Sequence, residues 1–570
     1  MSQRIVLPFP ANGINRRAGF QSESPGSCQD AVNVRLNDSI AGRDRGGSRP
    51  GMERVHAANT TGPIRMLHTL RFFQNQQNKS RLVASAGGVI FMENDVGSLQ
   101  AVSYAGNISS WNQVQAVDSG GKLYIINTGR SASGEWVTYG SEYYDRANCG
   151  GGAEFQPYPF YRPCYYGDAS SIAGSANIQS RIALDGPPKV FDPTNYSIAN
   201  LTADEDKGTV PTGCSIGTLY RGRLFLAGDY SNPQQWYASR AGVFTDWDYA
   251  ADDRDPSRAV SGTNSYAGVI AAPITALAPH SDLCMVMSAS TQMWILRGDP
   301  TTGNLDQLST QIGIIDKNAW CHTADGWLVF LSQDGLWAMP NQCGVSDGNM
   351  VPISRPRLPE ELLNIDPFLY SVSLAYDVRD IGIHVFISPN FPTSDTAQHW
   401  WLDWTNRSFW RVECNSNCDP MITCTRRDIA DSNSLVMLGC RDGYIRRFSR
   451  SKQHDDDEYE FSSHVVYPAI SGEGDSEFIV KGIVAKLASG TGPIKWGIRG
   501  NVTSYEAYAG TAIRSGIWRY FNKLLTTNSR MRIRAGDFSV KLEAATPGER
   551  WAIEQVVLEL DRVSCAGGCK

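Results

Sequence analysis

The first place where chemistry could occur is a serine between two glycines. Gly213, Ser215 and Gly217 spell G-x-S-x-G, the pattern of a nucleophile elbow, in which the serine lies on a sharp turn between a strand and a helix. In this chain a Pro-Thr loop precedes the serine and a strand-like run follows it. A chain with 54 glycines also produces such a match by chance. We therefore do not predict a nucleophile here.

A second pattern concerns carbohydrate chemistry. Glycosidases use paired carboxylates, and those built as propellers carry repeated S-x-D-x-G-x-x-W boxes. The nearest approach in this chain is Ser332, Asp334, Gly335 and Trp337, in which the glycine comes one position early and no second copy exists. The carboxylates of residues 246–255 show no spacing that separates an acid from a nucleophile. We predict that the chain is not an enzyme, and the alternative is a carbohydrate-binding or glycoside-hydrolysing propeller.

Metal and cofactor chemistry finds equally little support. The thirteen cysteines are an odd number without a targeting signal, which favours buried free thiols over a disulfide framework. A zinc tetrathiolate remains conceivable, but its second close pair is missing. The eight histidines show no ligand spacing, and no P-loop or dinucleotide fingerprint is present, so we predict no metal and no cofactor. The cysteines considered for zinc are Cys414, Cys418, Cys424 and Cys440, with a further pair at Cys565 and Cys569.

The elements that must position these residues are short strands. The chain has 570 residues with 54 Gly, 28 Pro, 15 Trp, 23 Tyr and 20 Phe, and only 19% are charged. Aromatic residues suit pleated strands, whereas Gly and Pro suit turns. A hairpin pattern, two apolar runs around a glycine turn, recurs from residue 64 onward. It is found at residues 81–93, 114–129, 216–228, 283–298, 323–340, 378–388 and 435–449.

The spacing of these hairpins indicates a repeat architecture. Apart from one long gap, they recur every 30 to 60 residues or so, the size range of propeller blades. Further strand pairs such as residues 400–413 lie between them. Four short strands per unit without helical periodicity predict an all-β fold, a β-propeller of six to seven blades. A large β-sandwich is the alternative. We place the first blades at residues 61–137 and the remaining blades at 212–450.

A long gap separates the two groups of blades. Residues 138–211 are rich in Tyr, Gly and Pro, which predicts an inserted loop or subdomain. Loops of this length are usually functional or disordered, and the aromatic density argues against disorder. Because tyrosine gives a large contact area at low entropic cost, we expect the insertion to contact other proteins. The candidate interface tyrosines are Tyr143, Tyr144, Tyr158, Tyr161, Tyr165 and Tyr166.

The two ends of the chain differ in composition and predicted structure from the blades. Residues 1–60 form an N-terminal segment with one short strand and an arginine-rich Gly loop. This segment is either a basic arm or a surface that pairs with acidic neighbours across a blade or subunit boundary. Residues 451–460 form an acidic linker, a solvated hinge or a site for a hard cation. Alternation with period two predicts a C-terminal β-sandwich at 461–570. The arginines are Arg35, Arg43, Arg45 and Arg49.

The net charge of the chain excludes a protein that binds nucleic acid through an overall basic surface. The formal net charge is −6, so there is no overall basic field to neutralise phosphates. No run approaches the 18 apolar residues of a membrane-spanning helix, and the start of the chain does not read as a signal peptide. We expect a soluble protein that is made in a cytoplasm and has no membrane-spanning segment.

Residues 220–260 resemble the propeller core of podovirus tail nozzle proteins, the tail tubular protein B type. In that family a strand of the form "fRnRLffag" precedes an Asn-Pro turn, a "v~~S" strand and an aromatic-Asp segment. Residues 272–299 are similar to the next blade of the family. Residues 31–55 are similar to its "NvR" strand and "RRGG~rp" turn, and the chain from about 461 is similar to its terminal sandwich. The matching positions in the core are Arg221, Arg223, Leu224, Phe225, Asn232, Pro233, Trp236, Tyr237, Ser239, Phe244, Trp247 and Asp248.

The resemblance implies a structural protein of the virion tail. The carbohydrate-binding or glycoside-hydrolysing alternative would also be associated with the virion. The structural protein would form a ring, a homohexamer, at the distal end of a short tail, next to the tail adaptor and to tail fibre, spike or needle proteins. Genomic DNA would pass through the ring without specific binding. Six chains of charge −6 would carry about −36, and such an acidic lumen repels phosphate. The 138–211 insertion has no counterpart in the family pattern.

Overall fold

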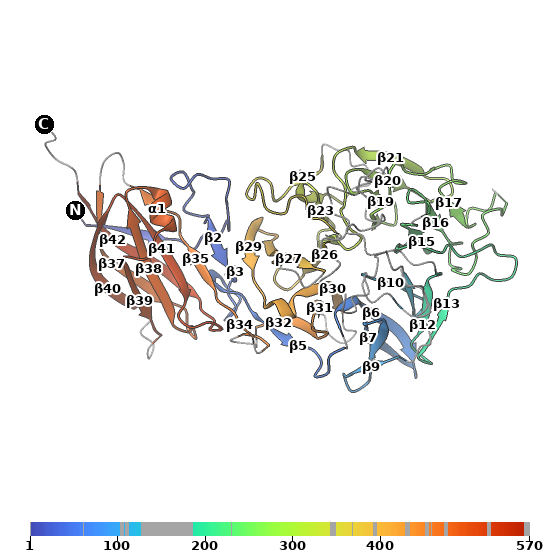
Figure 1. Cartoon of the computed structure of the whole chain (residues 1–570), viewed down its shortest axis with the longest axis horizontal. Helices are drawn as coiled ribbons and strands as arrows, with labels where there is room; N and C mark the ends of the chain where they lie inside the picture. The colour runs from blue at the N-terminus through green and yellow to red at the C-terminus, as the bar shows by residue number, and fades with distance from the viewer. Residues whose placement is uncertain are drawn as a thin grey trace, which may run out of the picture.

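The structure is a computed structural model, and it describes most of the chain. The described residues are 2–60, 62–102, 108, 113–126, 186–229, 231–252, 254–341, 349–367, 369–390, 396–427, 434–450, 455–457, 459–471, 477–520 and 526–563. Figure 1 shows two bodies, a strand sandwich on the left and a ring of sheets on the right, with N-terminal strands between them. Among the described residues, no helix is long and apolar enough to span a membrane.

The ring is a β-propeller with seven antiparallel runs of four strands in the described part of the chain. The first six blades use strands in chain order, which is the hairpin pattern that the sequence predicts. Blades 1 to 3 are β6 (Ile64–Gln74), β7 (Gln77–Ala86), β8 (Val89–Glu93) and β9 (Leu99–Ala101); β10 (Gln115–Ser119), β11 (Lys122–Ile126), β12 (Lys189–Asp192) and β13 (Ser197–Asn200); and β14 (Ile216–Tyr220), β15 (Arg223–Ala227), β16 (Trp236–Ala238) and β17 (Val260–Ser261). Blades 4 to 6 are β18 (Ala276–Ser281), β19 (Cys284–Ser288), β20 (Met293–Arg297) and β21 (Asn304–Ser309); β22 (Trp320–His322), β23 (Leu328–Ser332), β24 (Gly335–Met339) and β25 (Val351–Pro352); and β26 (Tyr370–Asp377), β27 (Gly382–Pro389), β28 (His399–Asp403) and β29 (Ser408–Val412).

Blade 7 closes the ring with a strand from the start of the chain. It consists of β30 (Pro420–Arg427), β31 (Ser434–Cys440), β32 (Ile445–Ser449) and β5 (Gly51–Arg54), and a short 3-10 turn, η2 (Ser416–Cys418), precedes it. In the register, Met52 pairs with Phe448. The innermost strand β30 lies against β6 of blade 1. Closure therefore depends on contacts between residues about 400 positions apart.

The blades pack face to face through apolar side chains. Separate clusters of buried residues join blades 1 and 2, blades 2 and 3, and blades 3 and 4, and a larger one continues through blades 4 to 6 into the sandwich. Two-residue turns join the first two strands of blades 1 to 4. In blade 3, for example, Arg221 and Gly222 both have positive φ, 49° and 70°, as a two-residue hairpin turn of primed type requires.

The C-terminal body is a β-sandwich, as the sequence predicts. Its first sheet has the order β1-β42-β37-β40, and its second contains β35, β41, β38 and β39, with β36 paired to β41. The helix α1 (Ser504–Ala509) packs on β38 and β41. The strands are β1 (Ser2–Leu7), β35 (His464–Val466), β36 (Ile470–Ser471), β37 (Glu477–Leu487), β38 (Ile494–Asn501), β39 (Arg514–Trp518), β40 (Thr526–Ala535), β41 (Asp537–Ala544) and β42 (Ile553–Val563).

The N-terminal segment is distributed over both bodies instead of forming a unit of its own. Strand β1 joins the sandwich, β5 completes blade 7, and β2 (Asp30–Val32) pairs with β29 of blade 6 and with β35 of the sandwich. Strand β2 thereby joins blade 6 and one sandwich sheet into a ten-stranded sheet. Strands β3 (Val34–Asn37) and β4 (Asp44–Ser48) form a hairpin between the bodies (Figure 1).

Two predicted boundaries need correction. Strands β12 and β13 lie within the predicted insertion at 138–211 but are the outer strands of blade 2. The glycine-turn pattern missed this hairpin because residues 193–196, which connect β12 to β13, contain no glycine. The acidic linker at 451–460 contains β33 (Asp455–Asp456) and β34 (Tyr459–Glu460), and Asp456 and Asp457 are buried. Those two carboxylates are therefore not part of a solvated hinge.

Candidate functional site

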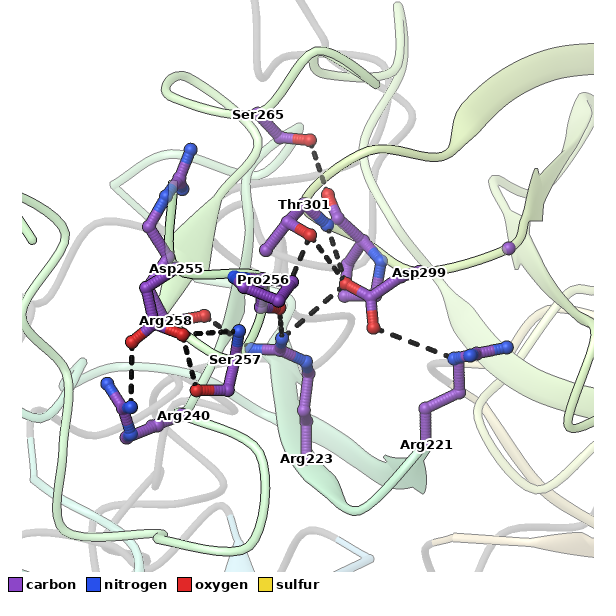
Figure 2. A network of polar contacts seen from close by, with 12 residues as sticks. Arg221, Arg223, Arg240, Asp255, Pro256, Ser257, Arg258, Ser265, Asp299 and Thr301 are labelled. Atoms are coloured by element: carbon purple, nitrogen blue, oxygen red, sulfur yellow. Dashed lines mark hydrogen bonds and ion pairs between the residues drawn. The ribbon is translucent and has the colours of Figure 1, made fainter. Parts of the chain in front are cut away.

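The strand turns on one face of the propeller are held together by arginines. Arg223 begins β15 and is buried. Its Nη1 donates to the carbonyl oxygen of Ser239 at 3.0 Å, and its Nη2 donates to that of Pro256 at 2.7 Å and to Asp299 Oδ1 at 3.4 Å (Figure 2). Burial lowers the pKa of Arg223, and the charge of Asp299 opposes that effect. Arg223 therefore fixes the long loop between β16 and β17.

The surrounding residues extend this network to blade 4. Asp299 Oδ1 accepts hydrogen bonds from the backbone N of Thr301 at 3.0 Å and from its hydroxyl at 2.7 Å, and Asp299 Oδ2 lies 3.6 Å from Arg221 Nε (Figure 2). Arg240 pairs with Asp255 at 2.7 Å. Hydrogen bonds from Ser257 lower the pKa of Asp255 to about 2. The network joins the outer loops of blades 3 and 4 into one surface.

Two hollows open where these turns meet. A hollow of 570 Å³ between blades 1 and 2 is lined by Phe73, Lys79, Lys122 and Asp192 among others. The other hollow, of 460 Å³, lies where blades 3, 4 and 5 meet, and its lining includes Tyr220, Asp282 and two histidines.

The two histidines are His280, in β18, and His322, in β22. Their rings are stacked with 3.5 Å between His280 Nδ1 and His322 Nε2. Burial lowers the pKa of both, that of His322 to about 4 with a further contribution from His280. The sequence analysis passed over them because they are 42 positions apart. They occupy equivalent positions in the first strands of successive blades, so a blade-by-blade alignment would have paired them.

Polar side chains fill the propeller axis. Lys317, just before β22 of blade 5, donates to the carbonyl oxygens of Gln113 at 2.6 Å and Ser215 at 3.1 Å. These partners precede the first strands of blades 2 and 3. Gln113 also donates to the carbonyl of Met421 in blade 7 at 3.0 Å and accepts from Asn318 at 2.8 Å. Since blades 2 and 5 are three apart in the ring, direct contact between them shows that side chains occupy the axis at this level.

Ser215, the serine of the G-x-S-x-G pattern, has a structural place. Its hydroxyl donates to the carbonyl of Gly228 at 3.1 Å, and the side chain is buried. The backbone N of Gly217 donates to Gln115 Oε1 at 2.9 Å. The strand β14, and not a helix, follows the serine, so the geometry of a nucleophile elbow is absent at this position.

Arg49 is at the centre of the junction between the propeller and the sandwich. It forms a bidentate ion pair with Asp456 of the acidic linker. It also donates to Asn33 Oδ1 at 2.8 Å and to the carbonyl of Glu413 at 3.0 Å, and it stacks 3.9 Å from the ring centre of Phe461. Burial alone would lower the pKa of Arg49, but Asp456 outweighs it and raises the pKa.

The other N-terminal arginines are placed differently from one another. Arg35 is buried over the Trp401 ring at 4.0 Å and pairs with Asp380 at 3.4 Å; burial, opposed by Asp380, lowers its pKa to about 10. Arg45 pairs with Asp38 at 2.9 Å and with Glu554. Arg43 is exposed.

These positions change the prediction for the arginines. Arg35 and Arg49 are enclosed by their own chain, so they offer no surface to a second subunit, and they pair across a boundary within the chain. The role of Arg43 and Arg45 in an interface stays a prediction. All six candidate tyrosines, Tyr143, Tyr144, Tyr158, Tyr161, Tyr165 and Tyr166, lie outside the described residues. Their segment connects β11 to β12 of blade 2.

Most of the described cysteines are free and buried, but Cys414 and Cys424 are only partly buried. Cys284 is disulfide-bonded, so the prediction of free thiols does not hold for this residue. Cys418 and Cys440 are buried, and burial raises the pKa of both thiols, that of Cys418 to about 12. Cys424 Sγ lies 3.9 Å from the hydroxyl of Thr69. Within the described residues, no three His, Cys, Asp or Glu side chains are grouped so as to hold a metal ion. Cys565 and Cys569 lie outside those residues.

Comparisons with known proteins bear on the fold alone. No family model and no curated protein matches the chain. Among solved structures it is similar to virginiamycin B lyase from Staphylococcus aureus, at 8% identity and a TM-score of 0.36, over 70% of this chain and 97% of that one. It is also similar to YCF48 from Cyanidioschyzon merolae, at 11% identity and a TM-score of 0.35, over 70% and 99%.

A third similar structure is the extracellular domain of the putative hybrid two component system BT4673 from B. thetaiotaomicron. The identity is 11% and the TM-score 0.36, over 75% of this chain. The present chain spans only 42% of the length of that domain. Scores this low carry no argument about activity, and the propeller itself is established by the strand pairing described above.

Proposed function

We propose that the chain is a structural subunit of a short phage tail, where it forms a ring-shaped nozzle at the distal end of the tail tube and conducts and gates genome ejection. The ring is a homohexamer in the virion tail, assembled from chains made in the host cytoplasm. Its partners are the tail adaptor and tail fibre, spike or needle proteins. The genomic DNA passes through the lumen without specific binding.

The observation that carries the proposal is the connection between the two bodies. Strand β2 continues blade 6 into a sandwich sheet, and the buried pair of Arg49 and Asp456 lies at the same junction. A continuous sheet resists bending better than a flexible linker, because rotation of one body would break backbone hydrogen bonds. A subunit that bears load in a tail needs this rigidity.

The positions that resemble the nozzle family also build this framework. Arg223 fixes the loops of blades 3 and 4. In strand β4 of the N-terminal segment, a Cβ on Gly47 would clash with the carbonyl oxygen of Trp551 in the sandwich. Only glycine allows this approach of β4 to the sandwich. The resemblance therefore falls on residues with a structural reason for their type.

The filled axis of the propeller bears on the route of the DNA. Lys317 and Gln113 meet across the axis, so a duplex does not fit through the blades of one chain. In the proposed ring the lumen lies between subunits, and the chain charge of −6 makes its wall repulsive to phosphate on average.

The test is the assembly state. Six chains of 62.6 kDa would give a particle of about 376 kDa, which mass photometry resolves from a monomer, and negative-stain class averages down the symmetry axis would show the ring order. The purified chain should be measured alone and with lysate of phage-infected cells that contains the tail proteins. Monomers under both conditions would contradict the proposal, as would hydrolysis of host surface glycans by the purified chain.

A further inference from the structure

Two histidines, His280 and His322, lie together in the hollow between blades 3, 4 and 5. His280 is 6% exposed, and both imidazoles line the opening of 460 Å³. Each comes from the first strand of its blade, so two rigid sheets hold the rings in place. Trp320 packs edge-on against His322, with ring centres 5.4 Å apart.

The hydrogen bonds of His280 determine which nitrogen is available. Its Nε2 lies 2.8 Å from the carbonyl oxygen of Pro340 in blade 5. A carbonyl oxygen only accepts, so Nε2 carries the proton and, in the neutral ring, Nδ1 carries a lone pair. The proton is assigned to Nε2 from its hydrogen-bond partner, the carbonyl oxygen of Pro340. The lone pair of Nδ1 is on the side of His322 Nε2, 3.5 Å away.

That separation suits two ligands of a single metal ion. Zinc binds imidazole nitrogen at about 2.0 to 2.1 Å in tetrahedral geometry, which places two ligand nitrogens roughly 3.3 to 3.4 Å apart by the same geometry. The observed 3.5 Å differs by no more than a small rotation of either ring. As a hydrogen bond the same distance is long.

The surroundings leave room for the rest of a coordination sphere. Ser281 and Asp282 line the same opening. Because the described residues contain no group of three metal-binding side chains, they supply two nitrogens to this site, and the remaining positions are open to water or to a further ligand. Imidazole ligands suit Zn²⁺, Cu²⁺ and Ni²⁺ and do not suit the hard ions Mg²⁺ and Ca²⁺.

We propose that His280 and His322 form a binding site for a divalent transition-metal ion, Zn²⁺ or a metal of similar ligand preference, that bridges blades 4 and 5. The ion binds through His280 Nδ1 and His322 Nε2 and completes its coordination with water. It ties together the first strands of two blades and stabilises the propeller against separation of these blades, because a ligand that binds only the folded state stabilises that state.

The experiment is a titration of the purified full-length chain with Co²⁺ as a spectroscopic probe, followed by competition with Zn²⁺. We expect visible absorption bands of a tetrahedral or five-coordinate Co²⁺ ion that saturate at one equivalent and disappear when Zn²⁺ is added. The melting temperature should rise with added Zn²⁺ and be unchanged by Mg²⁺. Absence of a saturable signal would overturn the proposal.

Variants assign the signal to the two residues. His280→Ala and His322→Ala should each lose the saturable signal and the Zn²⁺-dependent rise in melting temperature, while circular dichroism confirms that they fold. His322→Gln is the second variant in case the alanine variant is unfolded. His68→Ala is the matched control, because His68 pairs with Asp118 at 3.1 Å in blades 1 and 2 and should keep full binding. Binding that persists in both His280 and His322 variants would refute the site.

Discussion

The buried arginine at the junction of the two bodies makes a quantitative prediction. In Arg49→Met the aliphatic part of the side chain still packs against Phe461, but the bidentate partner of Asp456 is removed. Both side chains of the pair are at most 1% exposed, so the remaining carboxylate stays buried with one backbone hydrogen bond, from Met52 at 3.0 Å. Breaking a buried ion pair in this way costs about 3 to 5 kcal/mol.

A second substitution separates the pair from its surroundings. In Arg49→Met with Asp456→Asn no charge remains buried, and the asparagine oxygen can still accept from Met52. The double variant should therefore recover at least half of the loss, since replacing both partners of a buried pair costs much less than removing one. Asp456→Asn alone leaves the guanidinium of Arg49 unpaired and should be as unstable as Arg49→Met.

The measurement is equilibrium unfolding in guanidinium chloride, with calorimetry to follow the propeller and the sandwich. Because the pair joins the two bodies, its loss should also separate their transitions. Arg447→Met is the control, since Arg447 pairs with Glu53 at 2.8 Å with 41% of its side chain exposed and should change stability by about 0 to 1 kcal/mol. A loss below about 1 kcal/mol in Arg49→Met, or no recovery in the double variant, would refute this account of the junction.

Three further predictions concern other parts of the chain. Burial lowers the pKa of His384 to about 4, so as the pH falls below about 6.5 the unfolded chain binds a proton at this residue and the folded chain does not. Between pH 7 and pH 5 this lowers the free energy of unfolding by about 2 kcal/mol. In urea unfolding at the two pH values, the His384→Phe variant should therefore lose about 2 kcal/mol less stability than the unaltered chain. Lys317→Met removes the hydrogen bonds from Lys317 Nζ to the carbonyl oxygens of Gln113 and Ser215 and should destabilise the propeller by about 1 to 3 kcal/mol without opening a second transition in calorimetry. A neutral result would contradict the axial role. Replacing residues 127–185 by a short Gly-Ser linker should preserve the circular dichroism spectrum, because Ile125 and Lys189 pair directly, and should abolish tail assembly; an unfolded product would show that the segment belongs to the core.

The sequence predicted the hairpins, which depend on local patterns. It did not predict the pairing of strands that are far apart in the chain. Glycine turns and apolar runs were sufficient for the hairpins, because two neighbouring strands carry the whole signal. The strand β5 could not be assigned to blade 7, since its partner β32 is nearly 400 residues away. For the same reason the partner of Arg49 was left open between a neighbour in the same chain and a second subunit, although both the arginines and the acidic linker were singled out.

The candidate site likewise depends on contacts between residues that are far apart in the chain. Arg223 was noted as part of a family-like strand, but its role depends on the carbonyls of a loop that no periodicity describes. His280 and His322 meet only because the blades repeat.

The use of the N-terminal segment has a consequence for how the chain reaches its folded state. Strand β5 closes the ring and β1 completes the sandwich, so neither body is finished until distant residues have come together. Strand β2 pairs with β29 and β35, which lie more than 50 residues apart, and so it needs parts of both bodies in place. Because pairings of such sequence separation form slowly, we expect the N-terminal segment to pair late in folding, after the blade and sandwich strands that it joins.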